Sequence, residues 1–321
     1  MSHDLKSLSI VIPCHNEEEV LGSLYKNLKD ILDCLMGNKI ESYELVFVNN
    51  GSTDGTIEKM LSLYEKDESV VIVDLRNNFG YQGSITAGLY HTSNEMIVTI
   101  DADLQDDPNK IEEMIEKHYE GFDLVLGVRE NRDSDSFLKR NSAEVFYRFM
   151  NFLGVNSVKN HGDFRLMSKS LLNDFKQYNE RNRYIRGMVL NLESKYAIVK
   201  YPRTARELGE TKFNFNRMIG LAFDGITSFS IAPIRMISLL GLIMFLMSLT
   251  GISYILYQKF LAGVPVEGWT FVALSISLFG GLNSLFIGVV GEYVGKNYIE
   301  SKQRPNFTVR KLYTKKINNV S

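Results

Sequence analysis

A short apolar run that ends in several acidic residues is the part of this sequence best suited to chemistry. Four carboxylates follow the run 96–100: Asp101, Asp103, Asp106 and Asp107. If the run is a strand of an open α/β sheet, these carboxylates lie at its carboxyl end, where such sheets bind ligands. Clustered carboxylates suit a hard divalent cation such as Mg²⁺ or Mn²⁺, and that cation would in turn bind a phosphate.

The same residues also fit the start of a helix. Asp107 is a good N-cap residue, and Pro108 suits the first helical position because its missing N–H has no partner there. A helical pattern does follow, over 109–119. The two interpretations are compatible, and we carry both forward.

Length and composition define the class of protein. With 321 residues, the chain is long enough for one large domain or two smaller ones. The formal net charge of -2 gives no sign of a nucleic-acid partner. Cys14 and Cys34 make no disulfide framework, which favours a reducing compartment. Segment 1–13 lacks a basic region followed by an apolar run, so we expect no signal peptide.

Strands and helices are predicted to alternate over the first 128 residues. Apolar runs predict strands at 8–13, 43–48, 70–75, 96–100 and 123–128. Helical patterns separate them, which is typical of βαβ units and predicts a mainly parallel sheet with its polar loops along one edge. After Arg129 the alternation lapses. Beyond it we predict helices near 146–153 and 171–175, and a late strand at 197–201.

The last third of the chain holds two long stretches without charge, 236–257 and 268–291. Each is long enough to cross a bilayer, which takes roughly 20 residues. Basic residues flank their outer ends, whereas the loop 258–267 has one Lys and one Glu, so the positive-inside rule places both ends in the cytoplasm. The aromatic, amphipathic segment 213–229 fits either a helix on the bilayer surface or a core helix.

Nine stretches of the chain resemble, in order, the membrane-bound polyprenyl-phosphate glycosyltransferases. These are inverting family 2 enzymes with a GT-A fold, and they include bactoprenol glucosyltransferases and dolichol-phosphate mannose synthase. The stretches are IVIPCHNEEE (10–19), FVNNGSTDGT (47–56), RNNFGYQGSITAGL (76–89), IDADLQDDP (100–108), GDFRLMSK (162–169), ERNRYIRG (180–187), ARELGETKF (205–213), DGITSFSIAPIR (224–235) and GEYVGKNYIESKQRP (291–305). The two apolar stretches at the C-terminal end point to the bacterial bactoprenol branch.

The resemblance implies an architecture in four parts. An α/β GT-A domain, Rossmann-like with a mainly parallel sheet, spans 1–212 and lies in the cytoplasm. A juxtamembrane amphipathic helix spans 213–234. Two transmembrane helices, at about 236–257 and 269–291, lie within 235–292, and a cytoplasmic basic tail spans 293–321. The implied location is the bacterial cytoplasmic membrane, with both termini in the cytoplasm.

The resemblance also implies roles on the donor side of the site. The implied nucleotide-sugar contacts are Pro13, Asn16, Glu17, Asn49, Asn50, Asp101 and Ala102. Members of the family usually have an acidic residue where Asn49 and Asn50 stand, but an amide offers both a donor and an acceptor for a base. Asp103 and Gln105 resemble the pair that binds Mg²⁺ or Mn²⁺.

On the acceptor side, Asp163 and Arg165 resemble an acid and a phosphate-binding cation, and together with Asp103 they form the implied catalytic set. Candidates for binding the lipid phosphate or the pyrophosphate are Arg129, Lys139, Arg140, Arg183, Arg206 and Lys212. A phosphate monoester is largely dianionic at neutral pH and is already a nucleophile, so Asp163 is expected to orient the acceptor rather than to act as an obligatory base.

The implied reaction is an inverting transfer of a hexose, glucose or N-acetylglucosamine, from a UDP-sugar to undecaprenyl phosphate. Implied partners are the lipid bilayer, further copies of the chain in a homotetramer, a flippase and a downstream glycosyltransferase, with no nucleic acid. Three alternatives stay open. They are a GDP-mannose enzyme similar to dolichol-phosphate mannose synthase, a processive polysaccharide synthase, and a non-catalytic membrane scaffold with a degenerate GT-A domain.

Overall fold

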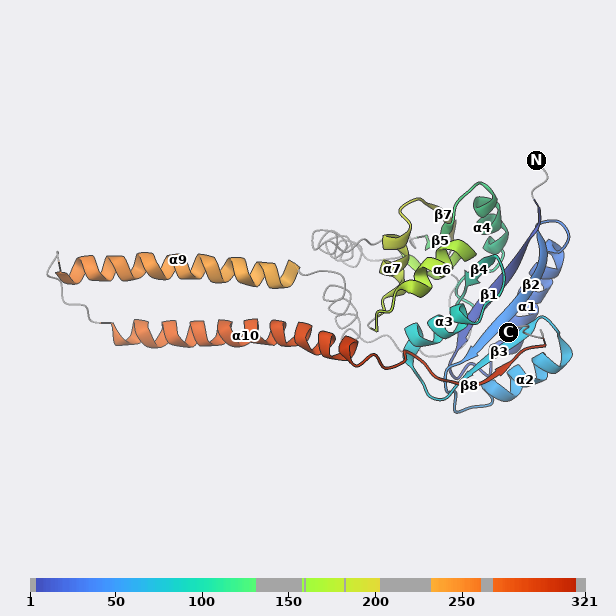
Figure 1. Ribbon diagram of the computed structural model, residues 1–321, viewed down its shortest axis with the longest axis horizontal. Helices are drawn as coiled ribbons and strands as arrows, with labels where there is room; N and C mark the ends of the chain where they lie inside the picture. Colours follow the sequence, from blue (N-terminus) through green and yellow to red (C-terminus); the bar gives the residue numbers. More distant parts are fainter. Residues whose placement is uncertain are drawn as a thin grey trace.

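The computed structural model describes residues 4–130, 158, 160–181, 183–202, 232–260 and 268–315. They form an α/β domain from which two long helices project side by side (Figure 1). Several predictions fall outside the described residues: the helix near 146–153, the amphipathic segment 213–229, and the site residues Lys139, Arg140, Arg206 and Lys212.

The described residues build one sheet of eight strands in the order β7-β5-β6-β4-β1-β2-β3-β8. The strands are β1 (Lys6–Cys14), β2 (Ile40–Asn49), β3 (Val70–Leu75), β4 (Met96–Thr99), β5 (Leu124–Arg129), β6 (His161–Ser168), β7 (Tyr196–Tyr201) and β8 (Val309–Tyr313). The central strands β3, β2, β1 and β4 are parallel, as predicted. Because β6 is antiparallel to β4 and β5, and β8 to β3, the whole sheet is mixed.

Helices cover both faces of the sheet, which explains why the strands read as continuous apolar runs. Helices α1 (Leu21–Leu35), α2 (Thr56–Lys66) and α4 (Lys110–Tyr119) contribute to one core cluster, together with Ile10 and Ile12 of β1. Helices α3 (Gly80–Tyr90), α6 (Lys169–Gln177) and α7 (Ile185–Leu192) contribute to the other, together with Val11. Successive residues of β1 therefore face opposite cores, as the period of a strand requires.

Helix α4 begins close to the predicted start, and Asp107 stabilises its first turn. The Asn109 N–H donates to Asp107 Oδ1 at 3.1 Å, and the Lys110 N–H donates to the Asp107 carbonyl at 3.1 Å. Asp107 therefore stabilises the turn that leads into α4, but the prediction that it is the N-cap residue was wrong: the helix begins at Lys110, and its N-cap residue, Asn109, makes no side-chain cap.

The order of the strands fixes where the polar loops meet. The chain builds outward from β1 through β2 to β3 and then returns to the other side of β1 as β4. This reversal makes a switch point between β1 and β4, and ligands of open α/β sheets bind at such a point, beyond the carboxyl ends of the strands. The loops that follow Cys14 and Thr99 therefore flank one crevice.

Two strands were not predicted from the sequence. All eight positions of β6 are buried, including Asp163 and Arg165, so the strand lacks the alternating pattern that would reveal it. Strand β8 lies in the segment expected to be a basic tail. It runs along the edge of β3, where it covers backbone groups that would otherwise be open to pairing.

The two projecting helices are α9 (Ala232–Phe260) and α10 (Trp269–Ser301), and they contain the two predicted apolar spans (Figure 1). Helix α10 continues beyond its predicted span, from position 291 to Ser301. Within the described ranges one helical segment, Leu278–Ser301, is long and apolar enough to cross a membrane. Large apolar side chains are exposed along both helices, among them Leu239, Met247, Ile276 and Ile287.

Gly88 of α3 lets this helix approach the sheet closely. A Cβ atom at this position would lie 2.3 Å from Val11 Cγ1 and 2.9 Å from Val48 Cγ2. We expect Gly88→Ala to lower the free energy of unfolding by about 1–3 kcal/mol, because the added methyl group overpacks the core. Thermal unfolding of the full-length protein in detergent, followed by circular dichroism, measures the effect.

Gly22→Ala is the matched control, because a Cβ atom at Gly22 in α1 meets nothing within 4 Å. A helical Gly→Ala change in open space is expected to leave stability unchanged or to raise it by up to about 1 kcal/mol. Equal stabilities of the two variants would contradict the close approach at Gly88.

Candidate active site

The loops that follow β1 and β2 are joined by hydrogen bonds. Asn16 Oδ1 accepts the Thr53 N–H at 2.8 Å, and the Asn16 N–H donates to Ser52 Oγ at 3.1 Å. The Glu17 N–H donates to Thr56 Oγ1 at 2.9 Å. Asn16 has φ 57, a left-handed conformation that asparagine tolerates better than most residues. Asn16 and Glu17, both expected at the nucleotide, therefore lie in a loop of fixed shape.

Asn49 and Asn50 are buried and bonded to neighbouring loops. Asn49 Nδ2 donates to Asp74 Oδ1 at 2.7 Å. Asn50 Nδ2 donates to Asn78 Oδ1 at 3.1 Å, and Asn50 Oδ1 accepts the Phe79 N–H at 2.9 Å. Asn49 thus joins the end of β2 to β3, and Asn50 joins the loops that follow these two strands. Contact of these amides with a nucleotide base stays a prediction. A base could bond only to amide atoms that still have a free donor or acceptor position.

Asp101 follows β4 and lies among other charged groups. Its Oδ1 accepts the Tyr81 hydroxyl, and its Oδ2 lies 3.9 Å from Arg129 Nη2. Burial and the negative charges of Asp106 and Asp163 raise the pKa of Asp101 to about 7. Carboxylates from two strands therefore gather at this edge of the sheet, and a bound cation would favour the ionised form of Asp101.

The sequence suggested no role for Asp106, but in the structure it binds side chains from two other strands. Its side chain is buried, and Oδ1 accepts Arg129 Nη2 at 2.8 Å and the Tyr201 hydroxyl at 2.5 Å. Arg129 was predicted to bind a phosphate. Its guanidinium lies between Asp106 and Asp101, so the loop after β4 contacts β5 through the charged Arg129 and β7 through the Tyr201 hydroxyl.

Asp163 of β6 is paired with two arginines. Arg165 Nη2 donates to Oδ1, and Arg186 Nη2 and Nε donate to Oδ2 at 2.7 and 3.0 Å. Burial by itself would raise the pKa of Asp163, but the charges of Arg186 and Arg165 outweigh it and hold the pKa well below its ordinary value. A carboxylate that is ionised and doubly paired is a poor proton acceptor, which fits an orienting role.

The antiparallel direction of β6 brings Asp163 to the carboxyl edge of β4. The Thr99 hydroxyl donates to the Asp163 carbonyl, and Thr99 is opposite Arg165 in the register of the two strands. A parallel strand would have placed the start of β6 at the other edge of the sheet. Asp101 and Asp163 therefore belong to one site because of strand direction.

Arg183, a predicted phosphate ligand, has a different set of partners from Arg186. Arg183 Nη2 donates to the Tyr178 carbonyl at 2.9 Å and to the Tyr90 hydroxyl at 3.2 Å, and its guanidinium lies over the Tyr90 ring. The structure thus brings Arg186 to Asp163 and leaves Arg183 to hold its loop in place. The Arg cluster in the sequence gave no means of choosing between them.

Asp103 and Gln105, the predicted metal pair, lie in the turn after β4. The Gln105 N–H donates to Asp103 Oδ1 at 3.2 Å, and Leu104 between them has φ 57. In the described part of the chain, no group of three or more His, Cys, Asp or Glu side chains is arranged to hold a metal. Mg²⁺ commonly takes only one or two carboxylates and completes its shell with substrate phosphates and water. The pair therefore fits a metal that binds together with a diphosphate.

The remaining predicted residues lie at the carboxyl ends of β1 and β4. Pro13 is the second-last residue of β1, next to Cys14. Ala102 is buried and follows Asp101 directly. Sequence reasoning did not select Tyr81, Tyr201 or Arg186 as site residues. Each lies more than 15 positions from the acid it contacts, so no local motif could have marked it.

Fold and site together define a mixed α/β protein with a cluster of carboxylates at the switch point of its sheet. The sequence model of the family described as "Glycosyl transferase family 2" matches residues 9–176, which include both Asp101 and Asp163. The chain belongs to glycosyl transferase family 2.

Curated relatives extend the similarity to nearly the full chain. "Uncharacterized glycosyltransferase YkcC" of Bacillus subtilis is 40% identical over 309 residues, 95% of this chain and 94% of the relative. "Prophage bactoprenol glucosyl transferase homolog" of Escherichia coli is 36% identical over 308 residues, 95% and 99%. "Bactoprenol glucosyl transferase" of Shigella phage SfX is 36% identical over 304 residues, 94% and 98%.

Among solved structures, glucosyl-3-phosphoglycerate synthase from Mycobacterium tuberculosis in complex with UDP aligns with a TM-score of 0.44 and 16% identity. The alignment covers 70% of this chain and 79% of that chain.

The raised pKa of Asp101 predicts a specific dependence of stability on pH. The pKa of aspartate in an unfolded chain is about 3.9, and that of Asp101 in the folded protein is about 7. At pH values between the two, Asp101 is protonated mainly in the folded state. Stability from this group therefore falls as pH rises through that window. Asp101→Asn removes the ionisable group and keeps an acceptor for Tyr81.

We expect the variant to gain stability relative to the unmodified protein as pH rises from about 4 to 7, with a constant difference above that. Thermal unfolding in EDTA at a series of pH values measures it. A difference that stays flat across the window would contradict the electrostatic picture of this strand end.

Proposed function

We propose that the chain transfers a hexose from a UDP-sugar to undecaprenyl phosphate, giving a sugar linked to the lipid through one phosphate. Glucose is the first candidate and N-acetylglucosamine the second. The observation that carries this proposal is the similarity to proteins named bactoprenol glucosyl transferase, which covers 94–95% of this chain. Such coverage includes the two long C-terminal helices as well as the α/β domain.

The proposed acceptor requires a membrane. We infer that α9 and α10 cross the bacterial cytoplasmic membrane as a hairpin, with the α/β domain and both termini in the cytoplasm. The support is the length and hydropathy of Leu278–Ser301 and the large apolar side chains exposed along both helices. An exposed apolar surface of that extent fits contact with lipid. The homotetramer stays a prediction.

The donor would bind in the crevice at the carboxyl ends of β1 and β4. Asp103 and Gln105 would hold Mg²⁺ or Mn²⁺ together with the diphosphate. A bound ion would act as a Lewis acid toward the departing diphosphate. The support for a cation here is geometric: Asp101, Asp103 and Asp106 follow the same strand, where burial and the neighbouring carboxylates raise the pKa of Asp101 to about 7.

The acceptor phosphate needs little help from a base, because at neutral pH it is largely dianionic. Its negative charge must approach a donor that is also anionic, so cations are needed to offset the repulsion. Arg165 and Arg186 lie at Asp163, and Arg129 lies between Asp101 and Asp106. We infer that Asp163 orients these arginines and the acceptor. Direct attack by the phosphate oxygen would invert the anomeric centre without a covalent enzyme intermediate.

A donor screen tests the proposal. Full-length protein in detergent is given undecaprenyl phosphate with radiolabelled UDP-glucose, UDP-N-acetylglucosamine or GDP-mannose, with and without EDTA, and the lipid product is identified by mass. We expect one UDP-sugar to label the lipid, and EDTA to abolish the labelling. A GDP-mannose product would favour the mannose alternative, and no transfer from any donor would favour a non-catalytic scaffold.

The proposed metal ligand Asp103 can be tested by substitution. If Asp103 holds the metal, Asp103→Ala should lower turnover by about a hundredfold or more, because the metal contributes several kcal/mol to stabilising the leaving group. Initial rates of labelled-lipid formation measure the loss. Asp107→Ala is the matched control, since Asp107 lies in the same loop but bonds to Asn109 in the turn before α4. Equal losses in the two variants would move the metal site elsewhere.

A further inference from the structure

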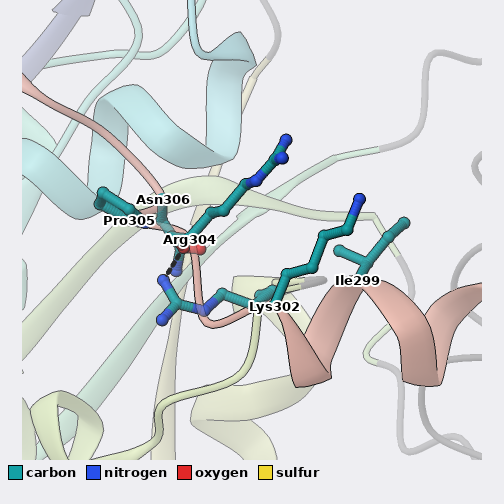
Figure 2. A pocket seen from close by; sticks show the side chains of 6 residues that line it. Ile299, Lys302, Arg304, Pro305 and Asn306 are labelled. Atoms are coloured by element: carbon teal, nitrogen blue, oxygen red, sulfur yellow. Dashed lines mark hydrogen bonds between the residues drawn. The ribbon is translucent and has the colours of Figure 1, made fainter.

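A pocket lies where α10 ends and the chain re-enters the α/β domain (Figure 2). Its volume is about 240 Å³, and its lining residues are Arg181, Ile299, Lys302, Arg304, Pro305 and Asn306. None of these residues is a partner of Asp101, Asp106 or Asp163 in the hydrogen bonds and ion pairs of the candidate active site. The pocket is therefore a separate feature, on the side of the domain from which the helices project.

The charge of the pocket points to an anionic ligand. Lys302 and Arg304 are exposed, and their side chains extend to the same side of the chain (Figure 2). Arg181 Nε is buried and has no hydrogen-bond partner within the described ranges. In the same ranges none of the three side chains forms an ion pair, although Lys302 Nζ lies 4.0 Å from the centre of the Tyr298 ring and the Glu300 carboxylate accepts the Arg181 backbone N–H. An anion would supply the charge that these side chains lack.

Hydrogen bonds hold the walls of the pocket in place, and Arg181 is the cation that takes part in them. Arg181 Nη1 donates to the Arg304 carbonyl, and the Arg181 N–H donates to Glu300 Oε1 at 2.6 Å. Asn306 Nδ2 donates to the Glu180 carbonyl at 3.1 Å. These bonds join the end of α10 to the loop before α7, so the pocket is built before any ligand arrives.

The position of the pocket indicates which kind of anion it would bind. The apolar segment Leu278–Ser301 ends at the pocket, and Ile299 is still 55% exposed one turn before Lys302. If α10 crosses the membrane, as proposed above, the cations lie at the level of the lipid head groups. Basic side chains beside a membrane helix attract anionic lipids.

We propose that this pocket binds the phosphate group of an anionic membrane phospholipid, with Lys302, Arg304 and Arg181 as its cations and Ile299 against the apolar part of the lipid. The inference rests on the proposed membrane location of α10 but not on the proposed reaction. The loop that forms one wall continues through Arg183 into α7, which carries Arg186. A bound lipid would fix this part of the site relative to the bilayer.

Binding by full-length protein in detergent tests the proposal. The protein is titrated calorimetrically with short-chain phosphatidylglycerol, short-chain phosphatidylcholine and inorganic phosphate in separate experiments. The variant Lys302→Gln/Arg304→Gln removes two cations and keeps the bond from Arg181 to the carbonyl of residue 304. The matched control Lys26→Gln/Lys66→Gln removes the same charge from exposed positions on α1 and α2.

We expect saturable binding of phosphatidylglycerol that weakens about thirtyfold in the pocket variant, through the combined loss of two cations at a lipid phosphate, and stays unchanged in the control. The charge-conserving variant Lys302→Arg/Arg304→Lys should bind as the unmodified protein does, which separates charge from folding.

Several results would overturn the proposal. Undiminished phosphatidylglycerol binding by the pocket variant would remove the pocket from the binding site, and an equal loss in the control would show an effect of net charge alone. Equal binding of phosphatidylcholine would exclude recognition of an anionic lipid, and equal binding of inorganic phosphate would identify a free anion as the ligand. Because the readout is binding, a protein that transfers no sugar still gives a decisive answer.

Discussion

Negative charge at the carboxyl end of β4 is the constraint on which the rest of the site depends. Asp101 and Asp106 follow this strand, and Asp163 enters beside it from β6. Carboxylates gathered in a buried place repel one another and lose solvation, so such an arrangement persists only if cations and hydrogen-bond donors are supplied. Burial, together with the charges of Asp106 and Asp163, raises the pKa of Asp101 to about 7.

The cations and hydrogen-bond donors that stabilise these carboxylates come from elements distant in the chain. Arg129 at the end of β5 contacts Asp106, and Arg186 at the start of α7 contacts Asp163. Tyr81 of α3 donates to Asp101. Breaking a buried ion pair by removing one partner typically costs about 3–5 kcal/mol. The charged network therefore ties the later part of the α/β domain to the strands laid down first, and the remaining negative charge faces the crevice where a donor and its metal are proposed to bind.

The C-terminal segment links the long helices to the same sheet. After α10 the chain passes the basic pocket and adds β8 to the edge of β3. Arg310 of β8 lies 3.6 Å from the Asp74 carboxylate, and Asp74 accepts the Asn49 amide. A continuous path of backbone pairing and side-chain contacts therefore runs from the end of α10 to the loop after β2. The helices are attached to the domain at an edge strand, not only through a linker.

Most of the core of this fold could be predicted from the sequence, because its signals are local. The apolar run 70–75 coincides with β3, and the alternation of strands and helices predicted the parallel centre of the sheet. Strand β6 was missed because buried charges interrupt its apolar pattern, and β8 was missed because its exposed basic residues resemble a solvated tail. In both strands, tertiary pairing overrides what the local pattern indicates.

From the sequence alone it follows that IDADLQDDP ends a buried strand with carboxylates and leads into a helix, since strand period and helical pattern depend on near neighbours. Only the tertiary structure decided how those carboxylates are divided. It buried Asp106 against Arg129 and Tyr201, left Asp101 with a raised pKa, and chose Arg186 over Arg183 as the partner of Asp163. The reason is physical: electrostatic compensation depends on distances of a few ångströms between groups that are far apart in the chain.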